Sequence, residues 1–71
     1  MPFVNIRLVK EVIADDPSGK KAKIAKKVSD AIVETTGLTK DDVWVVIEEV
    51  AAKDWFVGPT SVQDLRKAAG K

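Results

Sequence analysis

The segment 43–50, with the sequence VWVVIEEV, limits the possible folds of this chain more than any other segment. In a β-strand, alternate side chains point to opposite faces, and here both faces would be apolar. The two sets are Val43, Val45 and Ile47, and Trp44, Val46 and Val50. Near-continuous hydrophobicity is typical of a strand that is buried on both faces. The fold must therefore place apolar groups on each side of this strand.

A second strand and one long helix are expected before it. Residues 3–9, FVNIRLV, are rich in β-branched and aromatic types, which favours a strand. From about residue 18 to residue 36, apolar side chains recur at helical spacing, with Asp16 or Ser18 as the N-cap and Gly37 just beyond the end. The stripe consists of Ile24, Val28, Ala31, Ile32 and Thr35, widened by Ala22 and Ala25. This order predicts an α/β fold built on a βαβ unit with parallel strands.

Such a unit needs a partner. One helix covers only one face of a two-stranded sheet, and a chain of 71 residues has little left to cover the other. A core this small is marginal, and the chain has no cysteine for a disulfide. We therefore expect the fold to be completed by self-association into a homo-oligomer.

The remaining segments are short. Residues 10–16 run into turn-forming sequence, and the sequence leaves open whether this loop is a lid. After Trp55 and Phe56, a turn at 58–60 predicts a short C-terminal hairpin or turn, with 61–66 as a turn or strand that docks on something. We expect a single domain at 2–66 and a frayed tail at 67–71.

Composition excludes several kinds of chemistry. The chain has no His, Cys or Tyr, so imidazole, thiolate and phenol groups are absent and no metal site is expected. A net charge of +1 gives no overall reason to expect a nucleic acid or membrane partner. No segment approaches the roughly 20 apolar residues of a membrane span, and no signal peptide pattern is present, so a cytoplasmic protein is expected.

Pro2 is the best candidate for a catalytic base. Initiator methionine is normally removed before a small residue such as proline, which would leave a secondary amine at the chain start. An α-amino group has an ordinary pKa of about 7.7–8.0, and apolar surroundings lower it by disfavouring the cation. In a chain without histidine, this nitrogen is the available base near neutral pH.

The chain resembles the 4-oxalocrotonate tautomerase family. The resemblance rests on Pro2 opening a strand, an amphipathic helix of about 18 residues, a Val-rich strand ending at 47–50, and Trp55 six residues beyond Glu49. It implies a cofactor-free isomerase, assembled as a hexamer from three dimers, in which the proline moves a proton between oxygen and carbon of an enol. It also implies that Trp55 takes the place of the aromatic beside the proline.

The family's two substrate-binding arginines are missing. One position falls on Trp44, and the other falls at Asp15-Asp16-Pro17. A substrate with two carboxylates is therefore disfavoured, and an acid with one carboxylate, an apolar enol or a different activity of the superfamily is favoured. Arg7, Lys10 or Arg66 is expected to bind its carboxylate, and Arg66 matches a basic residue near the end of the family pattern. Trp44 would be core, interface or a pocket floor.

Three alternatives stay open. Pro2 could serve another reaction on a small carboxylate (dehalogenation, hydration or decarboxylation). The chain could instead be a non-catalytic oligomer that binds a ligand, with Trp44 filling the site. Five lysines at 20–27 could bind nucleic acid, but a solvated helix face is favoured because aromatic interleaving is absent. Glu48 and Glu49 are adjacent, so they should point to opposite faces rather than form an acid–base pair.

Overall fold

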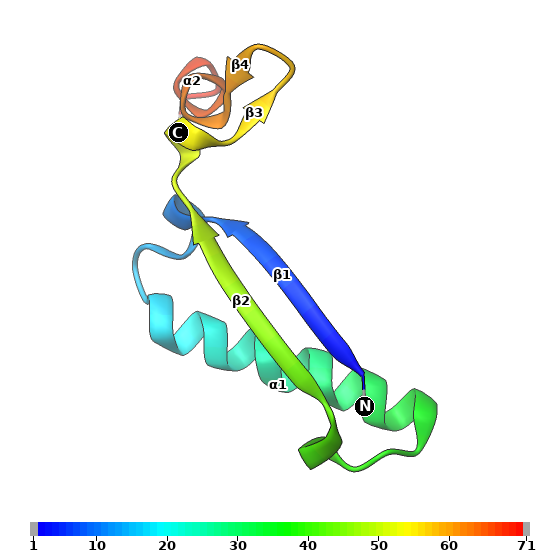
Figure 1. Cartoon of the computed structure of the whole chain (residues 1–71). Helices are drawn as coiled ribbons and strands as arrows, with labels where there is room; N and C mark the ends of the chain where they lie inside the picture. Colours follow the sequence, from blue (N-terminus) through cyan, green and yellow to red (C-terminus); the bar gives the residue numbers. More distant parts are fainter. Residues whose placement is uncertain (1, 71) are drawn as a thin grey trace.

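The computed structural model describes residues 2–70 and confirms the βαβ unit. Strands β1 (Phe3–Val9) and β2 (Trp44–Val50) pair in parallel, with a register that runs from Phe3 opposite Trp44 to Val9 opposite Val50. Helix α1 (Pro17–Thr36) connects them and lies along one face of the pair (Figure 1). The connection after α1 contains a 3₁₀ turn, η2 (Lys40–Asp42).

Local chemistry sets both ends of α1. The Asp16 side chain accepts a hydrogen bond from the Gly19 N–H at 3.3 Å, which makes Asp16 the N-cap. Gly37 has a φ of 77°, a left-handed conformation that favours glycine, and its N–H donates to the Val33 carbonyl at 2.9 Å. The predicted helix limits are therefore correct to within one residue.

The apolar stripe of α1 differs from the predicted one at its edges. Ile24, Val28 and Ile32 are half-buried against the sheet, as expected. Ala31 and Thr35 are exposed, and half-buried Ser29 and Val33 take the flank instead. The exposed Ala22 also lies outside the covered strip. The cause is the width of the sheet, since two strands cover only a narrow strip of the helix.

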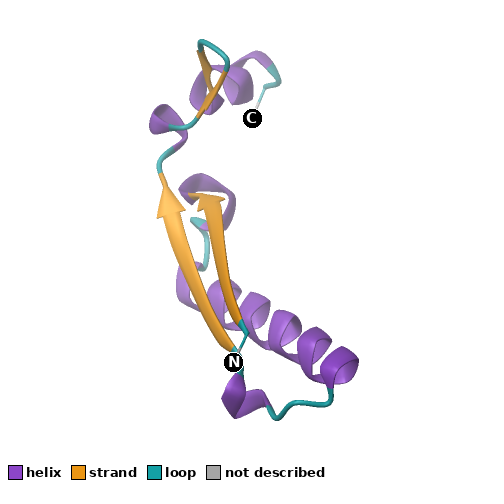
Figure 2. Ribbon diagram, turned by 45° about the vertical axis from the view of Figure 1, so that its right-hand side comes forward, coloured by secondary structure: helices purple, strands orange, loops and turns teal. Residues whose placement is uncertain are grey.

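The face of the sheet away from α1 is open (Figure 2). Phe3, Trp44 and Val46 on this face are 63%, 58% and 40% exposed, so the double burial predicted for β2 is not achieved within one chain. Among residues 2–70, only Ile13 and Ala52 are nearly fully buried apolar residues, with 4% and 3% exposed. A single copy therefore has almost no core of its own, which favours completion by other copies.

The segment predicted as a loop at 10–16 contains a 3₁₀ turn, η1 (Lys10–Ile13), and another, η3 (Ala52–Asp54), follows β2. The C-terminal part then forms the predicted hairpin, β3 (Phe56–Val57) and β4 (Thr60–Ser61).

The prediction of a turn or strand at 61–66 is wrong, because a helix, α2 (Val62–Ala68), forms there. The Ser61 side chain caps this helix by accepting from the Asp64 N–H at 3.2 Å. The helix includes Lys67 and Ala68, the first residues of the expected tail; Lys71 lies outside the described residues.

The C-terminal part extends beyond the ends of β1 and β2 rather than folding back on them (Figure 1). The molecule measures 44 × 26 × 16 Å, with a radius of gyration of 15.0 Å. A compact chain of this length would have a radius of about 11 Å. No helix among residues 2–70 is both long and apolar enough to cross a bilayer.

Candidate active site

Pro2 lies at the start of the sheet, where β2 holds its backbone. Its carbonyl accepts a hydrogen bond from the Trp44 N–H at 3.1 Å, which extends the ladder one residue before β1. Pro2 itself is half-buried. Met1 lies outside the described residues, so its removal and the free proline nitrogen stay predictions.

Trp44 lies beside this end of the sheet but on its open face. It is opposite Phe3 in the register, and paired residues of neighbouring strands share a face. The two exposed aromatic side chains form an apolar patch near Pro2. Trp44 is therefore too exposed to fill a binding site within its own chain.

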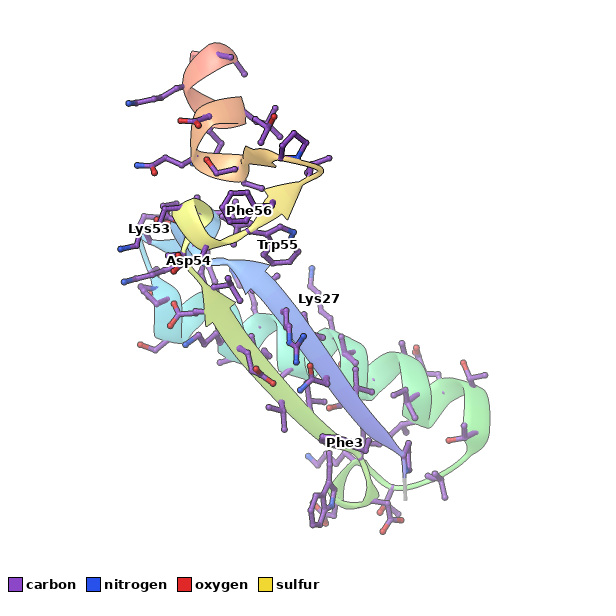
Figure 3. The ribbon with its side chains drawn as sticks, turned by 45° about the horizontal axis from the view of Figure 1, so that its top comes forward. Phe3, Lys27, Lys53, Asp54, Trp55 and Phe56 are labelled. Carbon is purple, nitrogen blue, oxygen red and sulfur yellow. The ribbon has the colours of Figure 1, made fainter. Side chains whose placement is uncertain are left out.

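Trp55 and Arg7 meet at the opposite end of the sheet. They line a concavity of about 260 Å³ together with Val50, Asp54 and Phe56. Trp55 is half-buried, and its carbonyl accepts from the Val62 N–H at 2.7 Å, which ties this residue to the start of α2. Figure 3 shows Trp55 and Phe56 at this end and Phe3 at the other.

Arg7 is only loosely held. Its Nε lies 3.6 Å from Glu48 Oε2, and its side chain is 65% exposed. Glu48 Oε1 accepts a hydrogen bond from Asn5 Nδ2 at 2.8 Å on the same open face. Glu49 points the other way and pairs with Lys21 of α1 at 3.0 Å, which confirms that the two glutamates face opposite sides. The Arg7 guanidinium keeps donors available for an incoming carboxylate.

Lys10 and Arg66 lie near the same end as Arg7, around a residue that the sequence did not single out. Glu11 Oε1 accepts a hydrogen bond from the buried Ala52 N–H at 2.9 Å, and this bond holds the pKa of Glu11 below its ordinary value of 4.5. The positive charges of Lys10 and Arg66 lower the Glu11 pKa further. Glu11 thereby joins η1 to η3 across 41 residues of sequence, a contact that no local pattern indicates.

The candidate site residues therefore form two separate groups. Pro2 and Trp44 lie at one end of the sheet, and Arg7, Lys10, Trp55 and Arg66 lie at or beyond the other. Along β1, Pro2 and Arg7, the nearest members of the two groups on this strand, are about 17 Å apart at about 3.3 Å per residue. A small substrate cannot touch both groups of the same chain.

Comparisons with known proteins agree with this fold. A family model described as Tautomerase enzyme matches residues 2–65. The chain is 33% identical over 69 residues to Probable tautomerase K2 of Dickeya dadantii, covering 97% of this chain and 98% of that protein. It is 32% identical over 65 residues to 2-hydroxymuconate tautomerase of Pseudomonas putida, covering 92% and 97%. The crystal structure of DmpI from Helicobacter pylori superposes with a TM-score of 0.81 at 33% identity, covering 93% of this chain and 97% of that one.

Proposed function

The chain belongs to the tautomerase family, and we propose that it isomerises a small unsaturated 2-hydroxy acid to its 2-oxo form, with Pro2 as base and acid. The observation that carries this proposal is the position of Pro2. It is the first residue of the family match, it is half-buried, and its carbonyl accepts a hydrogen bond from the Trp44 N–H at the start of β2.

The reaction needs one proton carrier and no cofactor. The neutral Pro2 nitrogen takes the proton from the enol hydroxyl, and the electron pair of that bond forms the carbonyl. The carbon–carbon double bond then takes a proton from the Pro2 cation at the distant carbon, which returns the amine to its neutral form. One group acting in both steps leaves no net change in the enzyme.

A second copy is proposed to supply the other half of the site. Trp55 and Arg7 are too far from Pro2 of their own chain, and each copy exposes an apolar sheet face that requires cover. A homo-oligomer, a hexamer by resemblance, would bring the Trp55 end of one copy to the Pro2 end of another. Both the stability of the fold and the completeness of the site favour this arrangement.

The substrate is proposed to carry one carboxylate. The Arg7 concavity offers a single exposed guanidinium, and Asp54 in its wall disfavours a second negative charge. The ring of Trp55 provides an apolar surface beside that guanidinium for the unsaturated part of the substrate. Lys10 and Arg66 are weaker candidates, because both act on the nearby Glu11 carboxylate.

The test measures the ketonisation of two enols: the enol form of phenylpyruvate, which has one carboxylate, and 2-hydroxymuconate, which has two carboxylates. The protein is first checked by intact mass for Met1 removal. Replacing a general base typically costs 10²–10⁴ in rate, so Pro2→Ala should lose at least about 100-fold. Pro59→Ala, in the exposed hairpin turn, controls for loss of a proline. Equal, background-level rates for wild type and Pro2→Ala would refute the isomerase assignment, and a preference for the diacid would refute the role of Arg7.

A further inference from the structure

We propose that a concavity between η1 and the first half of α1 binds a small organic anion with an apolar body. The concavity has a volume of about 230 Å³ and is lined by Ile13, Lys20, Lys23, Ile24 and Lys27. None of these residues lines the Arg7 concavity, and none belongs to the paired strands β1 and β2 that hold Pro2. This anion pocket is thus a second site of the chain, separate from the candidate active site.

The positive charge of the anion pocket is not neutralised by the chain itself. Lys20 Nζ pairs with Asp15 at 2.6 Å, whereas neither Lys23 nor Lys27 forms an ion pair with any residue in the described range. These two lysines are four residues apart, so they lie on one side of α1, separated by about 6 Å along the axis. Their ammonium groups can reach the two oxygens of one carboxylate.

This arrangement is unfavourable for the helix alone. Like charges at this spacing destabilise a helix by a few tenths of a kcal/mol. Lys26, by contrast, pairs with Asp30 at 2.8 Å on the neighbouring side of the helix. The unpaired charge is concentrated on the side where the surface is hollow, which is what a bound anion would explain.

The floor of the anion pocket selects for an apolar body. Ile13 is 4% exposed, and Ile24 lies half-buried beside it, so the lining between the lysines is mostly aliphatic. An apolar cavity of about 150 Å³ is large enough for benzene, so this volume accepts a six-membered ring or branched chain attached to the charged group. Inorganic phosphate would leave the apolar floor uncovered. A nucleic acid is disfavoured because no aromatic side chain lines the pocket for stacking.

The experiment titrates 4-fluorophenylacetate into the oligomer and follows its fluorine NMR signal. The Pro2→Ala protein is used beside wild type, so binding is measured whether or not the chain is an isomerase. Removing both unpaired lysines in Lys23→Gln/Lys27→Gln should weaken binding about tenfold, because exposed charge pairs contribute up to about fivefold each. Lys40→Gln/Lys53→Gln removes the same charge from exposed positions outside the pocket and should bind as wild type. The uncharged analogue 4-fluorophenylacetamide should bind at least about tenfold more weakly than the acid.

Several results would overturn this inference. Equal weakening in the two double variants would show that the ligand responds to net charge alone. Equal binding of acid and amide would show that the lysines do not contact the ligand. Loss of binding in Arg7→Gln would place the ligand in the Arg7 concavity instead. Displacement of the ligand by a single-stranded oligonucleotide at an equal concentration would assign the lysines to nucleic acid.

Discussion

Two inactive variants of this protein should restore activity when they are assembled together. Pro2→Ala replaces the proposed base, a secondary amine, with a primary amine, and Trp55→Ala removes the aromatic wall at the other end of the sheet. Trp55 lies at the Arg7 end of the sheet, and Pro2 and Arg7 alone are about 17 Å apart along β1 at about 3.3 Å per residue. Under the proposed assembly, each site takes Pro2 from one copy and Trp55 from another. A mixed oligomer therefore contains some sites with both wild-type residues.

The recovery can be calculated from this geometry. In a random equal mixture, half of the copies carry Pro2 and half carry Trp55, so about a quarter of the sites are complete in a closed symmetric oligomer. The variants are unfolded together, refolded and assayed for ketonisation at a fixed total concentration, with native mass spectrometry to confirm mixing. A mixture of Pro2→Ala with the double variant Pro2→Ala/Trp55→Ala should recover nothing.

If mixed oligomers form but regain no ketonisation activity, the proposed assembly is refuted, because both residues of a site would then come from one chain. If Trp55→Ala fails to fold, Arg7→Gln replaces it, because Arg7 is exposed in the same concavity. The mixture should then again recover about a quarter of the wild-type activity above that of the separate variants, within about a factor of two.

Two further predictions concern assembly and acid stability. Val46→Lys should dissociate the proposed oligomer, because another copy would bury the new charge on the open face, whereas Gln63→Lys on exposed α2 should leave the oligomer intact. Light scattering with size-exclusion chromatography measures the mass of each variant. An unchanged mass for Val46→Lys would contradict the burial of that face by another copy. In the folded protein the pKa of Glu11 is below its ordinary value of 4.5. The hydrogen bond from the Ala52 N–H to the ionised Glu11 carboxylate therefore stabilises the fold fully above pH 4.5, and this stabilisation is lost as the pH falls through the folded pKa. Glu11→Gln keeps a hydrogen-bond acceptor but does not titrate. Between about pH 6 and pH 3, the urea concentration at the midpoint of unfolding should therefore fall less for this variant than for wild type. Equal falls would exclude Glu11 as a source of acid sensitivity.

Local patterns predicted the parts of the fold that local forces determine. The alternation in β1, the Gly37 end of α1 and the apolar run of β2 each act within a few residues, and each correctly predicts its element, with Asp16 as one of the two expected N-caps. The burial of both faces of β2 is not achieved within one chain. The α2 helix was missed although Ser61 with Asp64 three residues later is a start signal, because a helix of 7 residues is too short to show a clear period. The edge of the α1 stripe was misplaced because periodicity does not reveal the width of the covering sheet.

The split of the candidate site was available from the topology but not from residue types. In a parallel pair, a residue before the first strand and a residue after the second must lie at opposite ends, and this applies to Pro2 and Trp55. Resemblance alone presents these residues as neighbours, since it describes an assembled site. The Glu11 contact with Ala52 could not be predicted at all, because it depends on how η1 meets η3 in space.

Under the proposed assembly, the stability and the function of this chain depend on the same surface. A folded chain of 7.7 kDa would normally expose about 4,300 Å², and this one exposes 5213 Å² with aromatic side chains on its open sheet face. Burying that face against another copy would stabilise a sheet that has almost no core and would also place the Trp55 end of one copy near the Pro2 end of another. Substitutions on the open face would then remove activity through assembly even where they touch no substrate. A loss of activity in such a variant therefore assigns a catalytic role only when its oligomeric state is shown to be unchanged.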